Sequence, residues 1–318
     1  MNIVILDAHS LNPGDLSWEG IEAMGHVTIY ERTGQQDIIP RCKDAEIVLT
    51  NKVPFTQETL QALPALRLIC VTATGYNIID CEAARQQGIA VCNIPAYSTD
   101  SVAQMVFAHL LTVTNRVEHY THQVLNEQAW TTSPDFCFWN TPLLELSGKT
   151  FGIVGLGQIG MAVARIALAM NMRVIAITSK QQQQLPDGIT AVSRDEFFRE
   201  ADIISLHCPL TPTTEGLVCS QTLSLMKPTA IIINTSRGPV VNEQDVAEAL
   251  KGDRLAAFCT DVLTREPASA HNPLLSAPRV FITPHIAWAT LEARTRLMHI
   301  LEGNIRAYLN GMPTNVVN

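Results

Sequence analysis

Several features that mark membrane, secreted or nucleic-acid-binding proteins are scarce or missing in this chain. Charged residues make up 16% and aromatic residues 6% of its 318 residues. No uninterrupted apolar run reaches the roughly 18 residues of a membrane-spanning helix, and MNIVILDAHS at the N-terminus does not resemble a signal peptide. The net charge of −8 argues against nucleic acid or an anionic membrane as a partner. We expect a globular protein of the cytoplasm.

Common signatures of metal, disulfide and nucleophile chemistry are also absent. The 8 cysteines include no Cys-x-x-Cys pair, and several stand in apolar runs, as Cys70 does in LRLICVT. His119 and His122 have no third ligand at suitable spacing, so no metal site is predicted. His109, in an apolar helical run, is interpreted as a core residue. The sequence lacks Gly-x-Ser-x-Gly and Gly-x₄-Gly-Lys-Ser/Thr motifs, which disfavours an α/β hydrolase or a P-loop enzyme.

What the chain does contain is an alternation of short apolar runs with helical patterns, which indicates a parallel α/β architecture. The first series of predicted strands is Asn2–Asp7, Val27–Glu31, Glu46–Asn51, Leu66–Thr72 and Ile89–Ile94. The second series is Phe151–Gly155, Arg173–Thr178, Asp202–His207, Ala230–Thr235, Ala256–Val262 and Val280–Thr283. Six strands with intervening helices match a complete dinucleotide-binding sheet.

Two long helical patterns suggest how the two series are connected. One, Ser98–His122, separates the series, and the other, Leu291–Leu309, follows the last strand. A terminal helix after a finished sheet needs a surface to cover, and the first domain offers one. The prediction is an α/β protein of two doubly wound parallel-sheet domains. A Rossmann nucleotide-binding domain (99–287) is inserted in a flavodoxin-like substrate domain (1–98 with 288–318).

A glycine-rich turn follows the first strand of the second series. Gly155, Gly157 and Gly160 form Gly-x-Gly-x-x-Gly, and a helix is predicted over Met161–Met170. In such a turn the first glycine permits the sharp bend, and the second lets the backbone approach a pyrophosphate. The third allows close helix–strand packing. The position after the strand and before a helix therefore predicts a dinucleotide site at the helix N-terminus.

The residues that would distinguish the two nicotinamide cofactors depart from the NAD pattern. The end of the next strand usually supplies an acidic residue for the ribose 2′-hydroxyl. Here it reads Thr178, Ser179 and Lys180. Thr178 offers a hydroxyl, while Ser179 and Lys180 could hold a 2′-phosphate or remain solvated loop residues. The cofactor is predicted as NAD(H) or NADP(H).

Three polar residues follow predicted strands of the second series, where ligands bind in open α/β sheets. They are Arg237, Glu266 and His285. A guanidinium can bind a carboxylate bidentately, and an imidazole can exchange a proton with a carbonyl oxygen as hydride is transferred. A carboxylate hydrogen-bonded to the imidazole would hold its orientation. Each residue alone has an ordinary structural explanation, but together they predict hydride exchange at a 2-hydroxy acid.

The whole chain resembles the D-isomer-specific 2-hydroxyacid dehydrogenase family. The matching segments are Ala73–Asp80, Ser98–Ala103, Gly155–Gly160, His207–Thr214, Asn234–Pro239, Asp261–Pro267 and Thr283–Ala287. The segment Trp130–Thr150 is similar to the glycerate dehydrogenase, or hydroxypyruvate reductase, branch. The family resemblance also implies a homodimer with a small-molecule substrate, in which the Ser98–His122 region contributes to the interface.

The resemblance also implies roles for individual residues. Arg237 would bind the substrate carboxylate and carbonyl, Glu266 would be the partner of His285, and His285 would be the acid/base. Further substrate contacts would come from Lys52, Thr74 and Gly75. Cofactor contacts would come from Thr99, Val102, Gly155, Gly157, Gln158, Ile159, Gly160, Thr178, Ser179, Lys180, His207, Cys208, Pro209, Thr235, Ser236, Asp261, His285 and Ala287. Among these, Asp261 would bind the nicotinamide carboxamide and Thr99 the phosphate region, while His207–Pro209 would border the adenine.

The preferred reaction is the interconversion of hydroxypyruvate and D-glycerate, and two alternatives remain open. The first is a dehydrogenase for another small acid, such as glyoxylate or D-lactate. The second is a dinucleotide-sensing corepressor-like binding protein, since one fold serves several functions. The presence of Arg237, Glu266 and His285 together favours an enzyme.

Overall fold

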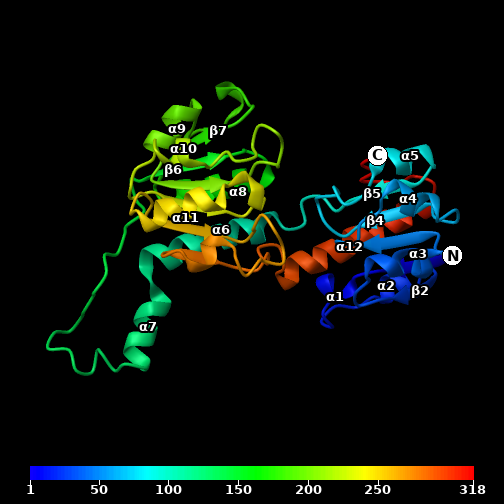
Figure 1. Ribbon diagram of the computed structural model, residues 1–318, viewed down its shortest axis with the longest axis horizontal. Coiled ribbons are helices and arrows are strands. Elements are labelled where there is room, and N and C mark those ends of the chain that lie inside the picture. Colours follow the sequence, from blue (N-terminus) through cyan, green and yellow to red (C-terminus); the bar gives the residue numbers. More distant parts are fainter. The chain divides into compact units, whose positions relative to one another are not determined.

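The computed structural model describes residues 1–318, which form two compact units (Figure 1). Unit 1 comprises Met1–Ser98 with Ala289–Asn318, and unit 2 comprises Thr99–Trp288. The chain thus passes from one unit to the other twice, at residues 98–99 and 288–289. None of the helices combines the length and the apolar character that crossing a bilayer requires.

Unit 1 is built on a five-stranded parallel sheet in the order β2-β1-β3-β4-β5. Its strands are β1 (Asn2–Ile5), β2 (His26–Ile29), β3 (Ile47–Thr50), β4 (Leu68–Val71) and β5 (Ala90–Cys92). All five predicted strands are confirmed; four lie within their predicted ranges and are shorter, and β2 begins one residue earlier and ends two residues earlier than expected. One reason is that residues beyond a strand make other hydrogen bonds: the Asp7 carboxylate accepts from the backbone N–H of Asn51 and Lys52.

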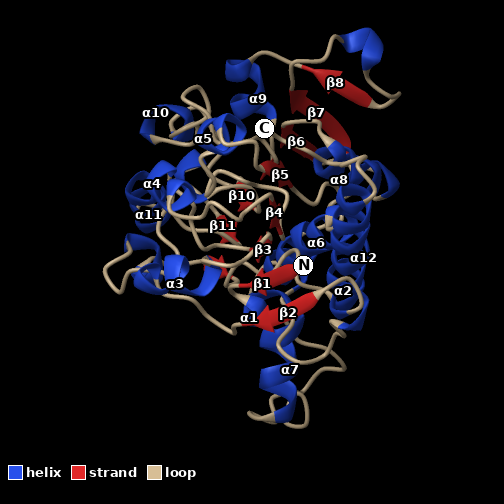
Figure 2. Cartoon of the chain, turned by 90° about the vertical axis from the view of Figure 1, so that its right-hand side faces the viewer, coloured by secondary structure: helices blue, strands red, loops and turns tan.

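Helices cover both faces of this sheet, which explains why its strands are apolar almost throughout. Figure 2 shows α3 (Ile38–Cys42), α4 (Gln57–Gln61) and α5 (Cys81–Gln86) on one side of the strands, and α2 (Glu19–Glu22) and α12 (Leu291–Leu309) on the other. The first three helices pack with one alternating set of strand side chains, among them Val4, Val48 and Ile69. The remaining regular elements of the unit are α1 (Ala8–Leu11) and the 3₁₀ turn η1 (Gln35–Asp37).

The C-terminal helix α12 spans the predicted residues and belongs to unit 1. Thr290 caps its N-terminus, where the side chain accepts from the Ala293 N–H. The largely buried Arg294 guanidinium donates to both carboxylate oxygens of Asp15, at 2.6 Å each, and to the Leu11 carbonyl. The helix is therefore attached to the N-terminal part of unit 1 by a bidentate ion pair as well as by apolar packing.

Unit 2 contains a seven-stranded parallel sheet in the order β12-β11-β10-β9-β6-β7-β8. Its strands are β6 (Thr150–Val154), β7 (Arg173–Ile177), β8 (Ile189–Ala191), β9 (Ile203–Leu206), β10 (Ile231–Asn234), β11 (Ala257–Thr260) and β12 (Val280–Ile282). Six of these strands were predicted. The edge strand β8 was not, so the expected total of six strands is wrong. Three residues are too few to show an alternating pattern, and β8 exists because it pairs with β7.

The seven-stranded sheet also has helices on both faces. Helices α6 (Thr99–Asn115) and α8 (Gln158–Ala169) pack with one core cluster, which includes Phe151 and Ile233. Helices α9 (Arg194–Glu200), α10 (Ser220–Leu223) and α11 (Glu243–Lys251) pack with the opposite cluster. The unit also contains three 3₁₀ turns: η2 (Gln182–Gln184), η3 (Gly238–Val240) and η4 (Pro273–Ser276).

The single helix expected over Ser98–His122 is wrong, because two helices occupy this region. Helix α6 ends at Asn115, Arg116 has a left-handed backbone conformation with φ 51°, and α7 (Val117–Leu125) begins next. Both helices have helical sequence patterns, so periodicity does not reveal a break at one residue between them. Helix α7 and the irregular segment 126–145 after it form an arm that extends from unit 2 (Figure 1).

Candidate functional site

The glycine turn connects β6 to α8 in unit 2, and two of its glycines are required by close contacts. Gly155 has φ 92°, and a Cβ there would lie 2.8 Å from the His207 carbonyl oxygen. A Cβ on Gly160 would lie 2.1 Å from the Gly155 carbonyl oxygen. Any larger residue at either position would therefore force backbone apart, so the tight turn and the close helix–strand packing both depend on glycine.

The turn leaves an exposed helix N-terminus that fits an anionic group. Gly157 is the N-cap of α8, and a Cβ added there would meet no atom within 4 Å. The backbone N–H groups of Gln158 and Ile159 lie in the first turn of α8 and have no acceptor within the helix. Open space beside unsatisfied N–H donors is what a pyrophosphate requires. The predicted cofactor contacts Thr99, Gly157, Gln158 and Lys180 line one hollow.

A neutral imidazole borders the turn on the β9 side. His207 Nε2 lies 2.8 Å from the hydroxyl oxygen of the buried Ser205, and burial lowers the pKa of His207 to about 3. Its neighbour Cys208 is buried, and burial raises the pKa of this thiol. The segment His207–Pro209 therefore presents an uncharged surface next to Gly155, which suits a heterocyclic base better than a phosphate.

The residues after β7 form a polar loop without a carboxylate. Thr178 is half-buried, and its hydroxyl accepts a hydrogen bond from the Lys180 backbone N–H at 3.2 Å. Ser179 and Lys180 are exposed. A hydroxyl and an ammonium group are therefore available at the end of the strand where an acidic residue would exclude a 2′-phosphate.

The loop that contains Arg237 follows β10 and is organised by Asn234. Asn234 is 1% exposed; its Oδ1 accepts from the N–H and hydroxyl of Ser236, and its Nδ2 donates to the Arg237 carbonyl. The exposed Arg237 guanidinium donates to the Ser236 carbonyl at 2.7 Å, which leaves further N–H donors for a ligand. The role of Asn234 was missed from the sequence, although Asn at the end of a strand is a recognised turn signal.

Gly238 brings this loop against the segment that precedes Glu266. A Cβ at Gly238 would lie 2.0 Å from the Leu263 carbonyl carbon, so two backbone segments touch there. The Leu263 N–H in turn donates to Glu266 Oε1 at 3.0 Å. The two loops after neighbouring strands β10 and β11 are thus held together by backbone contact, which no local sequence pattern indicates.

Glu266 and His285 form the predicted pair. Glu266 Oε2 lies 2.5 Å from His285 Nδ1, and the two side chains are 35% and 29% exposed. Since a carboxylate only accepts hydrogen bonds, Nδ1 is the donor, and Nε2 of His285 remains available for a ligand. His285 has φ 56°, an uncommon conformation for a residue with a side chain.

Asp261 is buried and supports the loop that contains His285. The residue is 2% exposed, and its carboxylate accepts from the Thr283 hydroxyl and from the backbone N–H groups of Ile286 and Ala287. Its carbonyl oxygen accepts from the His285 N–H at 2.8 Å. Contact between Asp261 and a nicotinamide carboxamide stays a prediction. The structure adds a supporting role for Asp261 and Thr283 that the sequence interpretation missed.

One polar atom beside the site lacks a hydrogen-bond partner. The Thr235 hydroxyl oxygen is buried without a partner, between Asn234 and Ser236 at the carboxyl end of β10. Buried polar atoms are normally paired, so an orphan atom here is consistent with a ligand that completes the bond. This observation and the open N-terminus of α8 are two independent indications that unit 2 fits a dinucleotide. The predicted contacts Val102 and Ala287 are both buried.

The predicted substrate contacts Lys52, Thr74 and Gly75 belong to unit 1. Lys52 follows β3, and Thr74 and Gly75 follow β4, so all three lie at the carboxyl edge of the five-stranded sheet. The Thr74 hydroxyl donates to the Ile94 carbonyl, and its carbonyl accepts from the Asn93 side chain, which fixes this loop. Their roles in substrate binding stay predictions.

The chain is similar to a known protein family and to several known dehydrogenases and reductases. Residues 107–287 match the family described as "D-isomer specific 2-hydroxyacid dehydrogenase, NAD binding domain". A hydroxypyruvate reductase of Blautia hydrogenotrophica is 45% identical over 322 residues, covering 100% of both chains. A glycerate dehydrogenase of Methylorubrum extorquens is 37% identical over 291 residues, covering 91% of this chain and 90% of that protein. The structure of an acyclic imino acid reductase, in complex with NADPH and D-Arg, aligns with a TM-score of 0.85 at 31% identity, over 100% of both chains.

Proposed function

This chain belongs to the D-isomer-specific 2-hydroxyacid dehydrogenase family, and from that premise we propose that it reduces hydroxypyruvate to D-glycerate with a nicotinamide cofactor. The observation that carries the chemistry is the 2.5 Å contact between Glu266 and His285. It lies in the same unit as a glycine turn that fits a pyrophosphate. The choice of substrate is supported by the relatives named hydroxypyruvate reductase and glycerate dehydrogenase.

In the proposed reduction, three side chains of unit 2 act on the keto acid. The reduced nicotinamide, when bound, supplies the hydride. Arg237 binds the substrate carboxylate through its remaining N–H donors and polarises the adjacent carbonyl. His285 gives the proton on Nε2 to the carbonyl oxygen and recovers one in the reverse direction. Glu266 keeps the proton on Nδ1 and stabilises the imidazole while it is charged.

We assign the two units separate roles in this proposal. Unit 2 holds the dinucleotide, since it contains the glycine turn and all the residues that match the NAD-binding family. Unit 1 is the substrate domain, a role first suggested by its motif Ala73–Asp80. NADP(H) is accepted as well as NAD(H), because Thr178, Ser179 and Lys180 provide hydrogen-bond donors and no negative charge.

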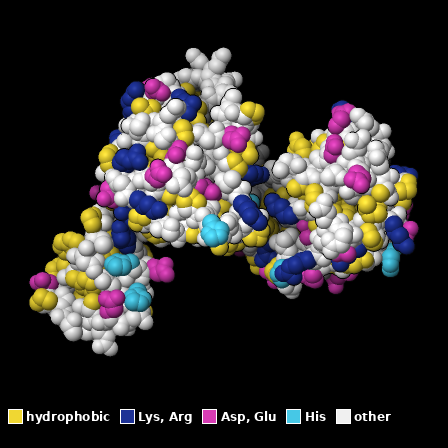
Figure 3. Space-filling model, in the orientation of Figure 1, with side chains coloured by type: hydrophobic (Ala, Val, Ile, Leu, Met, Phe, Trp, Pro, Cys, Tyr) yellow, Lys and Arg dark blue, Asp and Glu magenta, His cyan; other side chains and the backbone are white.

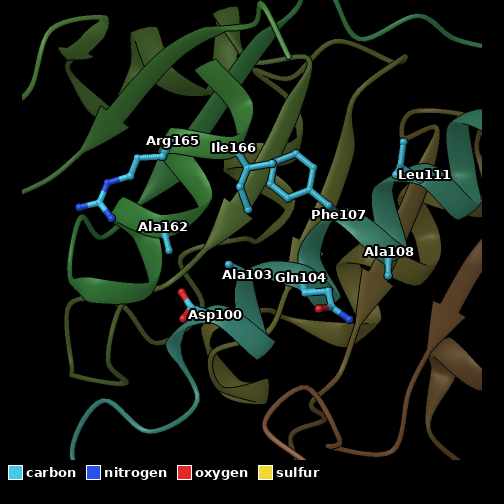
Figure 4. Close-up of a pocket in the computed structure, with 9 residues that line it drawn as sticks. All are labelled: Asp100, Ala103, Gln104, Phe107, Ala108, Leu111, Ala162, Arg165 and Ile166. Carbon is cyan, nitrogen blue, oxygen red and sulfur yellow. The ribbon is translucent and has the colours of Figure 1, made fainter. Parts of the chain in front are cut away.

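A homodimer is also part of the proposal, and the arm supports it. Large apolar side chains of α7 and segment 126–145 are exposed, with Leu125, Phe136 and Trp139 at 72%, 89% and 69%. Hydrophobic side chains gather on this part of the surface in Figure 3. Exposed apolar clusters of this kind mark interaction surfaces. In this proposal the arm docks on the second copy at the groove between α6 and α8, whose lining is largely apolar and includes Phe107, Ala162 and Ile166 (Figure 4).

Sedimentation tests the dimer. Phe136→Ser with Trp139→Ser is expected to give monomers at concentrations where the unmodified protein is dimeric. Met312→Ser, at an exposed apolar residue of unit 1, is the control and leaves the dimer intact.

A cytoplasmic location is proposed as well, since all 8 cysteines are free thiols and most are buried.

A steady-state panel tests the proposed reaction. Hydroxypyruvate, glyoxylate, pyruvate and phosphohydroxypyruvate are each assayed with NADH and NADPH, and hydroxypyruvate is expected to have the highest kcat/KM. His285→Ala serves as the inactive control; it lowers kcat by about 10²–10⁴-fold and keeps dinucleotide affinity. Dinucleotide binding without turnover of any of the four acids would instead support a corepressor-like binding protein. A higher kcat/KM for glyoxylate would reassign the substrate.

A further inference from the structure

A chain of three side chains links helix α6 to the loop that contains His285. His109, on α6, is 5% exposed, and its Nε2 lies 3.1 Å from the Thr283 hydroxyl oxygen. That hydroxyl oxygen lies 2.6 Å from Oδ1 of Asp261. His109 and Thr283 have no part in the proposed transfer of hydride or proton. An apolar residue would fill the position of His109 without needing a polar partner. Packing alone therefore does not explain why this position holds a histidine.

The donors and acceptors in this chain can be assigned without ambiguity. The Asp261 carboxylate accepts hydrogen bonds and the Thr283 hydroxyl has one proton, so Thr283 donates to Asp261. The lone pairs of the hydroxyl then accept from His109, which requires the proton to be on Nε2. Burial lowers the pKa of His109, although the charge of Asp261 opposes this effect. His109 is therefore a neutral imidazole in the Nε2–H tautomer.

The far end of the chain is the turn that aims the His285 side chain. Asp261 Oδ1 accepts from the Ile286 N–H at 2.9 Å, and Oδ2 accepts from the Ala287 N–H at 2.8 Å. His285 itself has φ 56° and donates its N–H to the Asp261 carbonyl oxygen. Left-handed residues of this kind persist only where their surroundings hold them. The orientation of the Asp261 carboxylate thus decides whether the turn keeps its shape.

We propose that His109 is a positioning residue for the dehydrogenase reaction. Its Nε2–H orients the Thr283 hydroxyl toward Asp261, and Asp261 then fixes the turn at residues 285–287 so that the His285 imidazole meets Glu266. Helix α6, which packs on β10 and β11, supplies the rigid base of this chain. The inference rests on the proposed catalytic role of His285, and it assigns a function to a side chain that sequence analysis places in the core.

Three substitutions of one residue separate positioning from packing. The amide nitrogen of Gln reaches about as far as Nε2 of His, whereas that of Asn reaches only about as far as Nδ1. His109→Leu and His109→Asn are expected to lower kcat about three- to tenfold, the effect of one neutral hydrogen bond, while KM for the keto acid changes by less than about twofold. His109→Gln is expected to restore kcat to within about twofold of the unmodified enzyme. Equal kcat values for all three variants and the unmodified enzyme would overturn the proposal, as would loss of kcat in His109→Gln with the fold intact.

A double-mutant cycle tests whether His109 acts through Thr283. Thr283→Val removes the hydroxyl, so His109→Leu combined with Thr283→Val should lower kcat no further than Thr283→Val alone. Thr283→Ser keeps the hydroxyl and is the control. Independent, multiplying effects on kcat would show that His109 does not act through Thr283 and would overturn the proposal.

One measurement is independent of turnover. In protein with ¹⁵N-labelled histidine, the ring signals of His109 should be those of the neutral Nε2–H tautomer and should change in Thr283→Val. An inactive protein with these signals would contradict the proposed function and leave the hydrogen-bond chain standing. An active enzyme with a charged or Nδ1–H His109 would contradict the chain alone.

Discussion

Glu266 and His285 are 19 residues apart in the chain and 2.5 Å apart in space, and each oxygen of the carboxylate has a different partner. Oε2 accepts from the His285 ring, and Oε1 accepts from the Leu263 N–H. The same carboxylate therefore fixes its own loop and the imidazole. This double use explains why a carboxylate suits the position better than an amide, which has only one acceptor atom.

Glu266→Gln is expected to lower kcat by about 10- to 100-fold, a part of the 10²–10⁴-fold that positioned proton transfer contributes. An amide satisfies either the Leu263 N–H or the His285 ring, and it cannot balance a charged imidazole. Dinucleotide affinity, measured by fluorescence titration, should change little. Glu248→Gln on α11 is the control, and an unchanged kcat in Glu266→Gln would exclude the proposed role of the pair.

Arg237→Ala is expected to raise KM for hydroxypyruvate and to lower kcat, because the guanidinium binds the carboxylate and polarises the carbonyl. Loss of a charged hydrogen bond is worth about 1.5–3 kcal/mol, or roughly 10- to 100-fold in KM. Arg237→Lys keeps the charge without the bidentate geometry, so its KM and kcat should lie between those of the unmodified enzyme and those of Arg237→Ala. Steady-state kinetics check both variants; if KM stayed constant in Arg237→Ala, substrate binding by Arg237 would be ruled out.

Gly238→Ala is expected to destabilise unit 2 by about 1–3 kcal/mol and to lower kcat, since the added Cβ overlaps backbone rather than a flexible side chain. Gly303→Ala on α12 is the matched control, because a Cβ there meets nothing within 4 Å. The control should gain about 0.5–1 kcal/mol, as alanine favours a helix over glycine. Urea unfolding of both variants checks the prediction, and equal stabilities would contradict it.

The low pKa of His207 predicts that the protein loses stability in mild acid. Its pKa is about 3 in the folded protein and 6.5 as a model value, so between these pH values the unfolded chain binds a proton that the folded chain does not. The free energy of unfolding therefore falls as pH falls through this window, by about 2 kcal/mol at pH 5 from this residue. Urea unfolding at pH 7.5 and pH 5 measures the change. His207→Gln should show a smaller difference between the two pH values, and an equal difference would rule out this source.

Lys180→Ala is expected to raise KM for NADPH about tenfold or more while KM for NADH changes little, since one charged hydrogen bond to a phosphate is lost. Lys251→Ala, at the exposed end of α11, controls for a change in net charge. Kinetics at low and moderate salt check the effect, which should weaken as salt rises. Parallel changes in both KM values would show that Lys180 does not recognise the 2′-phosphate.

Local patterns along the chain were enough to predict every strand of unit 1, helix α12 and the glycine turn, because each of these depends on periodicity or on neighbouring residues. They also indicated which residues follow strands, and so nominated Arg237, Glu266 and His285. Contacts between segments distant in the sequence determined the features that local patterns did not predict. Strand β8 forms because β7 offers an edge, α6 and α7 separate at one left-handed residue, and Gly238 is needed because Leu263 lies against it. His109 shows the same limit: its apolar neighbours predict burial, and only the approach of Thr283, 174 residues further along, gives its ring a hydrogen-bond partner.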